Sequence, residues 1–82
     1  MNKLGVVVMA QFKVGDLVQW NSEAGLVSGT VSKVVTSDMT FKGYVRHASV
    51  KDPQYIIKSD ASNHEAMHRG SALRPIRKVK VS

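Results

Sequence analysis

The absence of cysteine from a chain of only 82 residues is what most limits the folds open to this sequence. Neither a disulfide framework nor a thiolate zinc site can reinforce the structure, so apolar packing has to hold it together. A domain of this size buries only roughly 60% of the surface that its unfolded chain exposes. We therefore expect one small domain with a thin core.

The N-terminal segment carries a short apolar run, residues 4–9, after a single lysine. The run is too brief for a signal sequence with its cleavage site, and a membrane span needs about 20 apolar residues. We therefore expect a cytoplasmic protein without a membrane partner. Three interpretations of residues 1–10 stay open, namely an added leader, an upstream start and a disordered arm. We expect residues 11–82 to form one domain with a basic C-terminal strand or tail.

Residues 13–36 carry the clearest strand signals. The segment 13–20 predicts a turn that leads into a first strand, and the polar segment 21–25 predicts a loop. Residues 26–36 are rich in β-branched side chains and partly alternate, which predicts a second strand. Gly29 within it indicates a bulge or a sharp bend, as small barrels need.

The second half of the chain predicts shorter elements. Residues 37–52 predict a long polar connection with a short strand around residues 40–46. Residues 54–58 predict a central strand, and residues 64–73 predict a further strand followed by a single helical turn. Apolar and basic residues then alternate over residues 74–81, which predicts the last strand. Five short strands with one helical turn before the last predict an all-β, small curled barrel.

An ordered series of motifs across this region resembles the hypervirulence-associated Tudor-domain proteins. The motifs are Val14–Asn21 with the following Gly25 and Gly29, then Asp52–Asp60, then Glu65–Leu73. The resemblance implies a five-stranded Tudor-like barrel of the Src homology 3 type. It implies little about biochemistry.

Tudor-like barrels often bind methylated lysine or arginine through a cage of aromatic side chains. The candidate ligand-surface aromatics are Trp20, Tyr44 and Tyr55. Residues 56–58 are Ile-Ile-Lys, where cage proteins usually place further aromatics, and the lysine would repel a cation. The cage therefore looks incomplete, and we expect Trp20 to be a half-buried barrel edge instead of a methyl-lysine reader.

Residues 64–68, His-Glu-Ala-Met-His, fit the zinc metalloprotease pattern, in which a helix places two histidines one turn apart. A catalytic zinc needs a third protein ligand, and no His, Asp, Glu or Cys follows His68. In a strand the two histidines would lie roughly 13 Å apart, too far to share an ion. We therefore predict no metal site, and expect His64 and His68 at the surface.

Other catalytic patterns are missing from the sequence. No nucleophile elbow accompanies the serines, and the segment from Gly25 to Gly29 lacks the Lys and Ser/Thr of a phosphate-binding loop. We therefore expect a non-catalytic binding module that needs no cofactor.

Charge is distributed unevenly along the chain. Twelve Lys and Arg oppose six Asp and Glu, and no acid follows Glu65. A basic strip attracts phosphate backbones or acidic protein surfaces, although it can equally be a solvated, solubilising face. The leading hypothesis is a nucleic-acid-associated module with candidate contacts at Lys33, Lys42, Arg46, Lys51, Arg69, Arg74, Arg77, Lys78 and Lys80.

The alternative hypothesis is a protein-interaction or self-assembly module. In that case an exposed strand edge, with the apolar Val79 and Val81, would add to a partner's sheet. Neither the charge nor the strand pattern separates the two hypotheses, and the oligomeric state stays open. Added salt would weaken a nucleic-acid complex steeply and would leave a strand-pairing complex largely intact.

Overall fold

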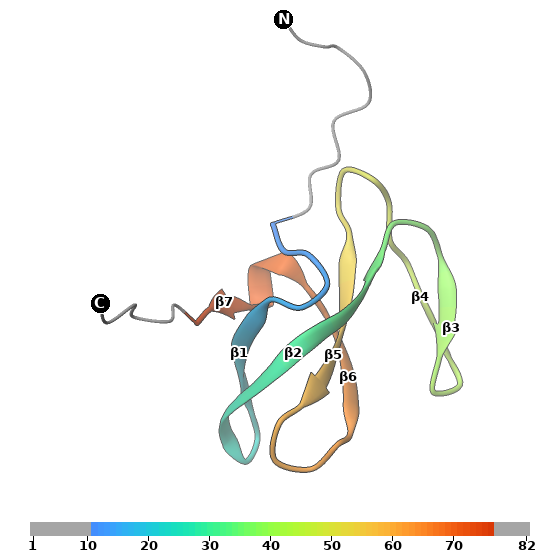
Figure 1. Cartoon of the computed structure of the whole chain (residues 1–82). Helices are drawn as coiled ribbons and strands as arrows, with labels where there is room; N and C mark the ends of the chain where they lie inside the picture. Colours follow the sequence, from blue (N-terminus) through green and yellow to red (C-terminus); the bar gives the residue numbers. More distant parts are fainter. Residues whose placement is uncertain (1–10, 77–82) are drawn as a thin grey trace, which may run out of the picture.

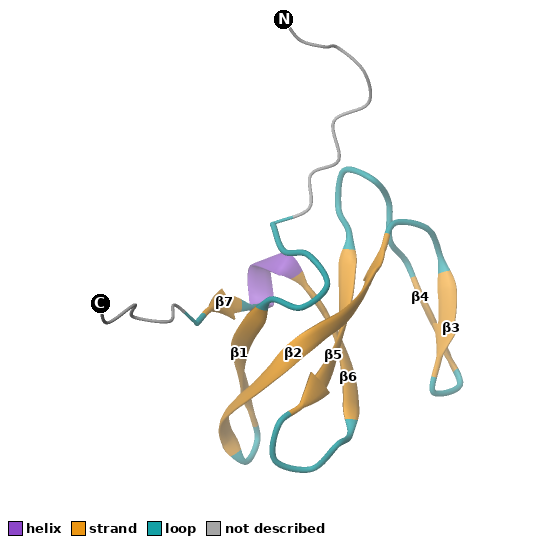
Figure 2. Cartoon of the chain, viewed as in Figure 1, coloured by secondary structure: helices purple, strands orange, loops and turns teal. Residues whose placement is uncertain are grey.

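The computed structural model describes residues 11–76 (Figure 1). Residues 1–10, with the arm that one interpretation places there, and Arg77, Lys78, Val79, Lys80 and Val81, lie outside the described residues. Strands dominate residues 11–76, and the one helical element in this range is a 3₁₀ turn, drawn in purple in Figure 2. The elements are β1 (Leu17–Ser22), β2 (Gly25–Val35), β3 (Met39–Phe41), β4 (Tyr44–Arg46), β5 (Gln54–Ser59), β6 (Glu65–Arg69), η1 (Gly70–Ala72) and β7 (Arg74–Pro75).

The strands form a five-stranded antiparallel sheet and a separate two-stranded hairpin. The sheet has the order β6-β5-β2-β1-β7, and the hairpin is β3-β4. The long strand β2 pairs with β1 through its first half and with β5 through its second half. Strands β6 and β7 are the two sheet edges, and the ladder of the described residues does not close into a barrel. The prediction of a small all-β fold with a helical turn before the last strand is confirmed.

The inner face of the sheet carries the main core. Because side chains alternate along a strand, every second residue of β1, β2 and β5 points into it. The ring of Phe12 meets that of Tyr55 edge to face at a centroid distance of 5.4 Å. The Tyr55 hydroxyl accepts a hydrogen bond from the backbone N–H of Gln11 at 2.8 Å. The buried residues of this core are Phe12, Val18, Trp20, Val31, Tyr55, Ile57 and Leu73.

A second, smaller core lies on the outer face of the same sheet. Val35, Ile56 and Met67 are buried there, and Met39 and Phe41 of the β3-β4 hairpin pack over them. Both faces of β5 are therefore covered, which explains why its apolar residues run consecutively instead of alternating.

The long connection between β2 and β5 differs from its prediction. It contains a two-stranded hairpin instead of one short strand. Lys42 and Gly43 link its strands with φ values of 52° and 86°. Positive φ at both central residues is the requirement of the tight turn that matches the twist of a hairpin.

A glycine is required at position 29 because β5 approaches closely, and not because β2 bulges there, as the sequence suggested. It lies opposite Ser59 in β5, and a Cβ atom at this position would lie 2.4 Å from the carbonyl oxygen of Lys58. The bulge of β2 comes later, between Val31 and Lys33. The close approach of β5 therefore selects the glycine.

Candidate functional site

Three lysines gather around the open part of the outer face, and we call them the lysine face: Lys33, Lys42 and Lys58. Lys33 pairs with Ile56, and Lys58 lies two residues further along β5 on the same side of the sheet. Diagonal neighbours of this kind lie roughly 7–8 Å apart. Lys33 and Lys58 are exposed, and the structure gives neither of them an ion pair within residues 11–76.

Lys42 reaches the lysine face from the turn of the β3-β4 hairpin. Its Nζ donates a hydrogen bond to the backbone carbonyl oxygen of Glu65 at 2.6 Å, and it lies 5.4 Å from the centroid of the Phe41 ring. Glu65 is directly opposite Lys58 in the ladder, so one acid borders the lysine face. Because its partner is a neutral carbonyl group, the charge of Lys42 is not cancelled by this bond.

Lys58 is the residue that the sequence analysis missed. From the sequence, Lys58 was considered only as a positive charge that would repel a methylated cation. The period of two along β5 was the available signal, because it puts Lys58 on the opposite face from Tyr55 and Ile57.

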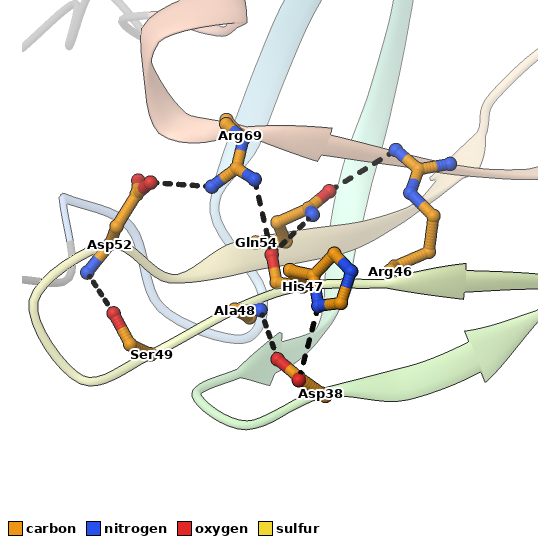
Figure 3. Close-up of polar contacts among 8 residues, drawn as sticks. All are labelled: Asp38, Arg46, His47, Ala48, Ser49, Asp52, Gln54 and Arg69. Atoms are coloured by element: carbon orange, nitrogen blue, oxygen red, sulfur yellow. Dashed lines mark hydrogen bonds and ion pairs between the residues drawn. The ribbon is translucent and has the colours of Figure 1, made fainter.

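Arg46 and Arg69, both predicted as nucleic-acid contacts, are engaged within the fold (Figure 3). Arg46 donates from Nη2 to the side-chain oxygen of Gln54 at 3.1 Å and to the carbonyl oxygen of Met67 at 2.9 Å. Arg69 forms an ion pair with Asp52 and donates to the carbonyl oxygen of His47 at 3.2 Å. These contacts tie the 38–52 segment to β5 and β6, so both arginines stabilise the fold of the free protein.

The same segment borders a small, open polar pocket of about 190 Å³. Asp38 accepts hydrogen bonds from the backbone N–H of Ala48 at 3.0 Å and pairs with Nδ1 of His47 at 3.1 Å. The Ala48 N–H, and then the His47 ring, lower the pKa of the Asp38 carboxyl group. These contacts orient the loop. The residues that line the pocket are Asp38, His47, Ala48, Ser49, Asp52 and Arg69.

The remaining predicted cations of the described residues are exposed at two separate places. Lys51 lies in the loop before β5, and Arg74 lies in the edge strand β7. Arg74 pairs with Gln19, which places it on the outer side of the sheet beside β1. Eight Lys and Arg and all six acids fall within residues 11–76, so most of the excess positive charge belongs to the flanking sequences.

The three candidate aromatics do not share one surface. Tyr44 in the hairpin is 74% exposed, whereas Trp20 is 6% exposed and Tyr55 is fully buried. The expectation of a half-buried Trp20 and an accessible Tyr55 is therefore wrong, because both rings fill the inner core. Only Tyr44 offers an open ring face, and it lies two residues from Lys42.

The two histidines of the protease-like pattern lie in and beside β6, which is a strand and not a helix. His64 is exposed, but His68 is half-buried with its ring 5.3 Å from that of Trp20. Burial, and then the charge of Arg46, lower the pKa of His68. Within residues 11–76 no group of three or more metal-ligating side chains comes together.

A second pocket, of about 310 Å³, is lined by residues of β1, β2, η1 and β7. The rim of Trp20 and the side chains of Leu26 and Ala72 give it apolar walls, and Asn21, Ser71 and Arg74 add polar groups. Arg74 would repel a methylated cation at this place. No helix of residues 11–76 is long and apolar enough to cross a membrane.

Comparison with known proteins agrees with this architecture. The family model described as the hypervirulence associated proteins TUDOR domain matches residues 15–73, from the turn before β1 to the residue after η1. No curated protein and no solved structure matches the chain. Tudor-type domains are generally small binding modules without catalytic activity. The chain belongs to the hypervirulence-associated Tudor-domain family.

Proposed function

We propose that this protein is a non-catalytic, cytoplasmic module that binds nucleic acid through the lysine face. The observation that carries the proposal is the convergence of Lys33, Lys42 and Lys58 on one side of the sheet, with no acid salt-bridged to them among residues 11–76. Clusters of lysine ammonium groups attract the negatively charged phosphate groups of nucleic acids, and this electrostatic attraction does not depend on base sequence.

Two further features support the same proposal. Tyr44 is exposed beside Lys42, so a base of a single strand has a ring on which to stack. The sequence after Glu65 contains Arg74, Arg77, Lys78 and Lys80 and no acid, so it adds to the positive potential. Arg46 and Arg69 contribute to this function through the fold, because they tie the 38–52 segment, which contains the hairpin with Lys42 and Tyr44, to β5 and β6.

A fluorescence-anisotropy titration with labelled single-stranded and double-stranded oligonucleotides at two salt concentrations tests the proposal. Binding that weakens sharply with added salt supports it. The absence of binding to any of the oligonucleotides at low salt would remove it.

A protein-interaction module is the second candidate function. The pocket of about 310 Å³ favours it, because its lining combines apolar groups with the polar side chains of Asn21, Ser71 and Arg74, which suits a short segment of a partner protein.

A further inference from the structure

Arg74 lies on the same side of the sheet as the lysine face. Its partner Gln19 alternates along β1 with residues of the inner core, so Gln19 and Arg74 both lie on the outer face. The lysine face lies on that side too, because Lys33 is paired with Ile56 of the outer core. The structure gives Arg74 no ion pair within residues 11–76. Its charge is therefore available to the ligand that binds the lysine face.

The surface between the lysine face and Arg74 is free of acids. Strands β2 and β1 separate Lys58 in β5 from Arg74 in β7. Neighbouring strands lie roughly 4.8 Å apart, so three steps across the sheet amount to roughly 14 Å. Strands β2, β1 and β7 contain no Asp or Glu, whereas Asp60 and Glu65 border the surface on its β5-β6 side. The separation of the charges is that of a few nucleotides in an extended strand.

The pocket of about 310 Å³ lies beside Arg74 at the end of this surface. Asn21 and Leu26, which are opposite each other in β1 and β2, line it on the outer face. Leu26 is 62% exposed and offers an apolar wall, and Asn21 and Ser71 offer an amide and a hydroxyl group. Glu23, in the exposed turn between β1 and β2, does not line the pocket.

We propose that this pocket takes one unstacked base of a single-stranded nucleic acid, whose phosphates lie along the outer face from the lysine face to Arg74. The inference rests on the proposed nucleic-acid function and names the form of nucleic acid that is bound. Domains that bind single strands combine a positively charged track for the backbone with separate places for bases. Here the exposed ring of Tyr44 is one such place and the pocket beside Arg74 is the other.

The size and chemistry of the pocket agree with a base. About 310 Å³ is at the lower end of the roughly 300–1,000 Å³ found for small-molecule sites, so there is room for one heterocycle and not for a large cofactor. Leu26 and the guanidinium plane of Arg74 suit the face of a base, and Asn21 and Ser71 suit its hydrogen-bonding edge. A duplex does not fit this site, because its bases are paired and stacked.

Trp20 is the single tryptophan of the chain and lines the pocket, so its fluorescence reports on occupancy. The probe is a labelled oligothymidylate of about eight nucleotides, within the range of site sizes for small barrels that bind single strands. The first control is an oligomer of equal length with an abasic residue at every position, and the second is a duplex hairpin.

The probe and its controls should separate the two parts of the interaction. We expect all three oligonucleotides to raise the anisotropy at low salt, because each brings phosphates to the lysine face. Only the oligothymidylate should change Trp20 emission. The abasic oligomer should bind at least roughly tenfold more weakly than the oligothymidylate, because it has no base to place.

Protein variants locate the base. Ala72→Leu should fill the pocket, abolish the Trp20 response and weaken the oligothymidylate roughly tenfold, and it should leave the abasic oligomer unchanged. Ala61→Leu, in the exposed loop between β5 and β6, is the matched control and should change neither. Leu26→Gln removes the apolar wall at an exposed position and repeats the test without filling the pocket. Circular dichroism of each variant checks that the fold is retained.

Arg74→Gln tests the path of the backbone. It should lower the slope of log K against log salt for the oligothymidylate by about 0.7, which is the loss of one phosphate contact in a single strand. An unchanged slope would show that the strand does not reach Arg74 and would contradict the inference.

The outcomes distinguish this inference from the proposed function. If no oligonucleotide binds at low salt, the proposed function fails and the inference fails with it. If the oligothymidylate and the abasic oligomer bind equally and leave Trp20 emission unchanged, nucleic acid binds through its backbone alone, only the inference fails, and the pocket is left for a segment of a partner protein. A Trp20 response that survives both Ala72→Leu and Leu26→Gln would also overturn it.

Discussion

Arg46 donates a hydrogen bond from Nη2 to the carbonyl oxygen of Met67 at 2.9 Å, so a side chain of the β3-β4 hairpin covers the edge of β6. Lys42 does the same for the carbonyl oxygen of Glu65. The two carbonyl groups are two residues apart on an edge strand, where unpaired groups invite pairing with another chain. The hairpin therefore protects the edge of β6.

The Arg46 contacts predict a measurable loss of stability. Arg46→Met keeps an unbranched side chain but leaves Gln54 and the Met67 carbonyl oxygen without their donor. Loss of these partly buried bonds should lower the free energy of unfolding by about 1–3 kcal/mol in urea denaturation. Arg74→Met is the matched control, because Arg74 is exposed at the other edge. Equal stability of the two variants would show that the hairpin does not depend on Arg46.

Two glycines should respond differently to the same change. Gly29→Ala places a Cβ atom 2.4 Å from the carbonyl oxygen of Lys58, so the backbone of β2 or β5 must move. We expect a loss of about 1–3 kcal/mol, as for other overpacked sites. At Gly70 the nearest atom is the side-chain Oε1 of Gln11, which can rotate away. Gly70→Ala should therefore stay within about 1 kcal/mol of the parent. Thermal melts of both variants in one buffer measure the difference, and the reverse order would contradict the packing described for β2 and β5.

The environment of His68 predicts a loss of stability in mild acid. Its pKa is lowered in the folded protein by burial and by Arg46. Below the ordinary value of about 6.5, the unfolded chain binds the proton first, so protonation favours unfolding. The free energy of unfolding should fall as the pH drops from about 7 toward the lowered pKa, and become independent of His68 below it.

Replacement of the ring isolates this effect. His68→Phe keeps an aromatic partner for Trp20 and should remove part of the acid sensitivity between the ordinary histidine pKa of about 6.5 and the lowered pKa of His68. His64→Gln, at an exposed position four residues away, should keep the parent profile. Identical pH profiles for the parent and His68→Phe would show that His68 does not destabilise the fold in acid.

Local sequence signals predicted most of the strands because the residue types of each strand follow directly from its burial. The β-branched run of β2 and the apolar run of β5 predicted strands there, and Gly70 marked the helical turn. The β3-β4 hairpin was harder to predict. Its strands have three residues each, and its turn uses Lys42 at positive φ, which is uncommon for a residue with a side chain.

The candidate site depended on contacts between residues far apart in sequence. Charge alone suggested that Arg46 and Arg69 were available, but Met67 and Asp52, both at least 17 residues away, engage them. Tyr55 looked like a strand aromatic at a ligand surface, and only the packing of Phe12 across it shows that it is buried. The pocket lined by Asn21 and Ala72 joins residues far apart in sequence, so no local pattern reveals it.

The most direct test of the lysine face compares two double variants of equal net charge. Lys33→Gln/Lys58→Gln removes two charges from the face, and Lys13→Gln/Lys51→Gln removes two from elsewhere. If the face binds single-stranded nucleic acid, the first variant should reduce the slope of log K against log salt by about 1.4, and the second should keep the parent slope. Equal slopes for the two variants, or no binding by the parent protein, would contradict the proposed function.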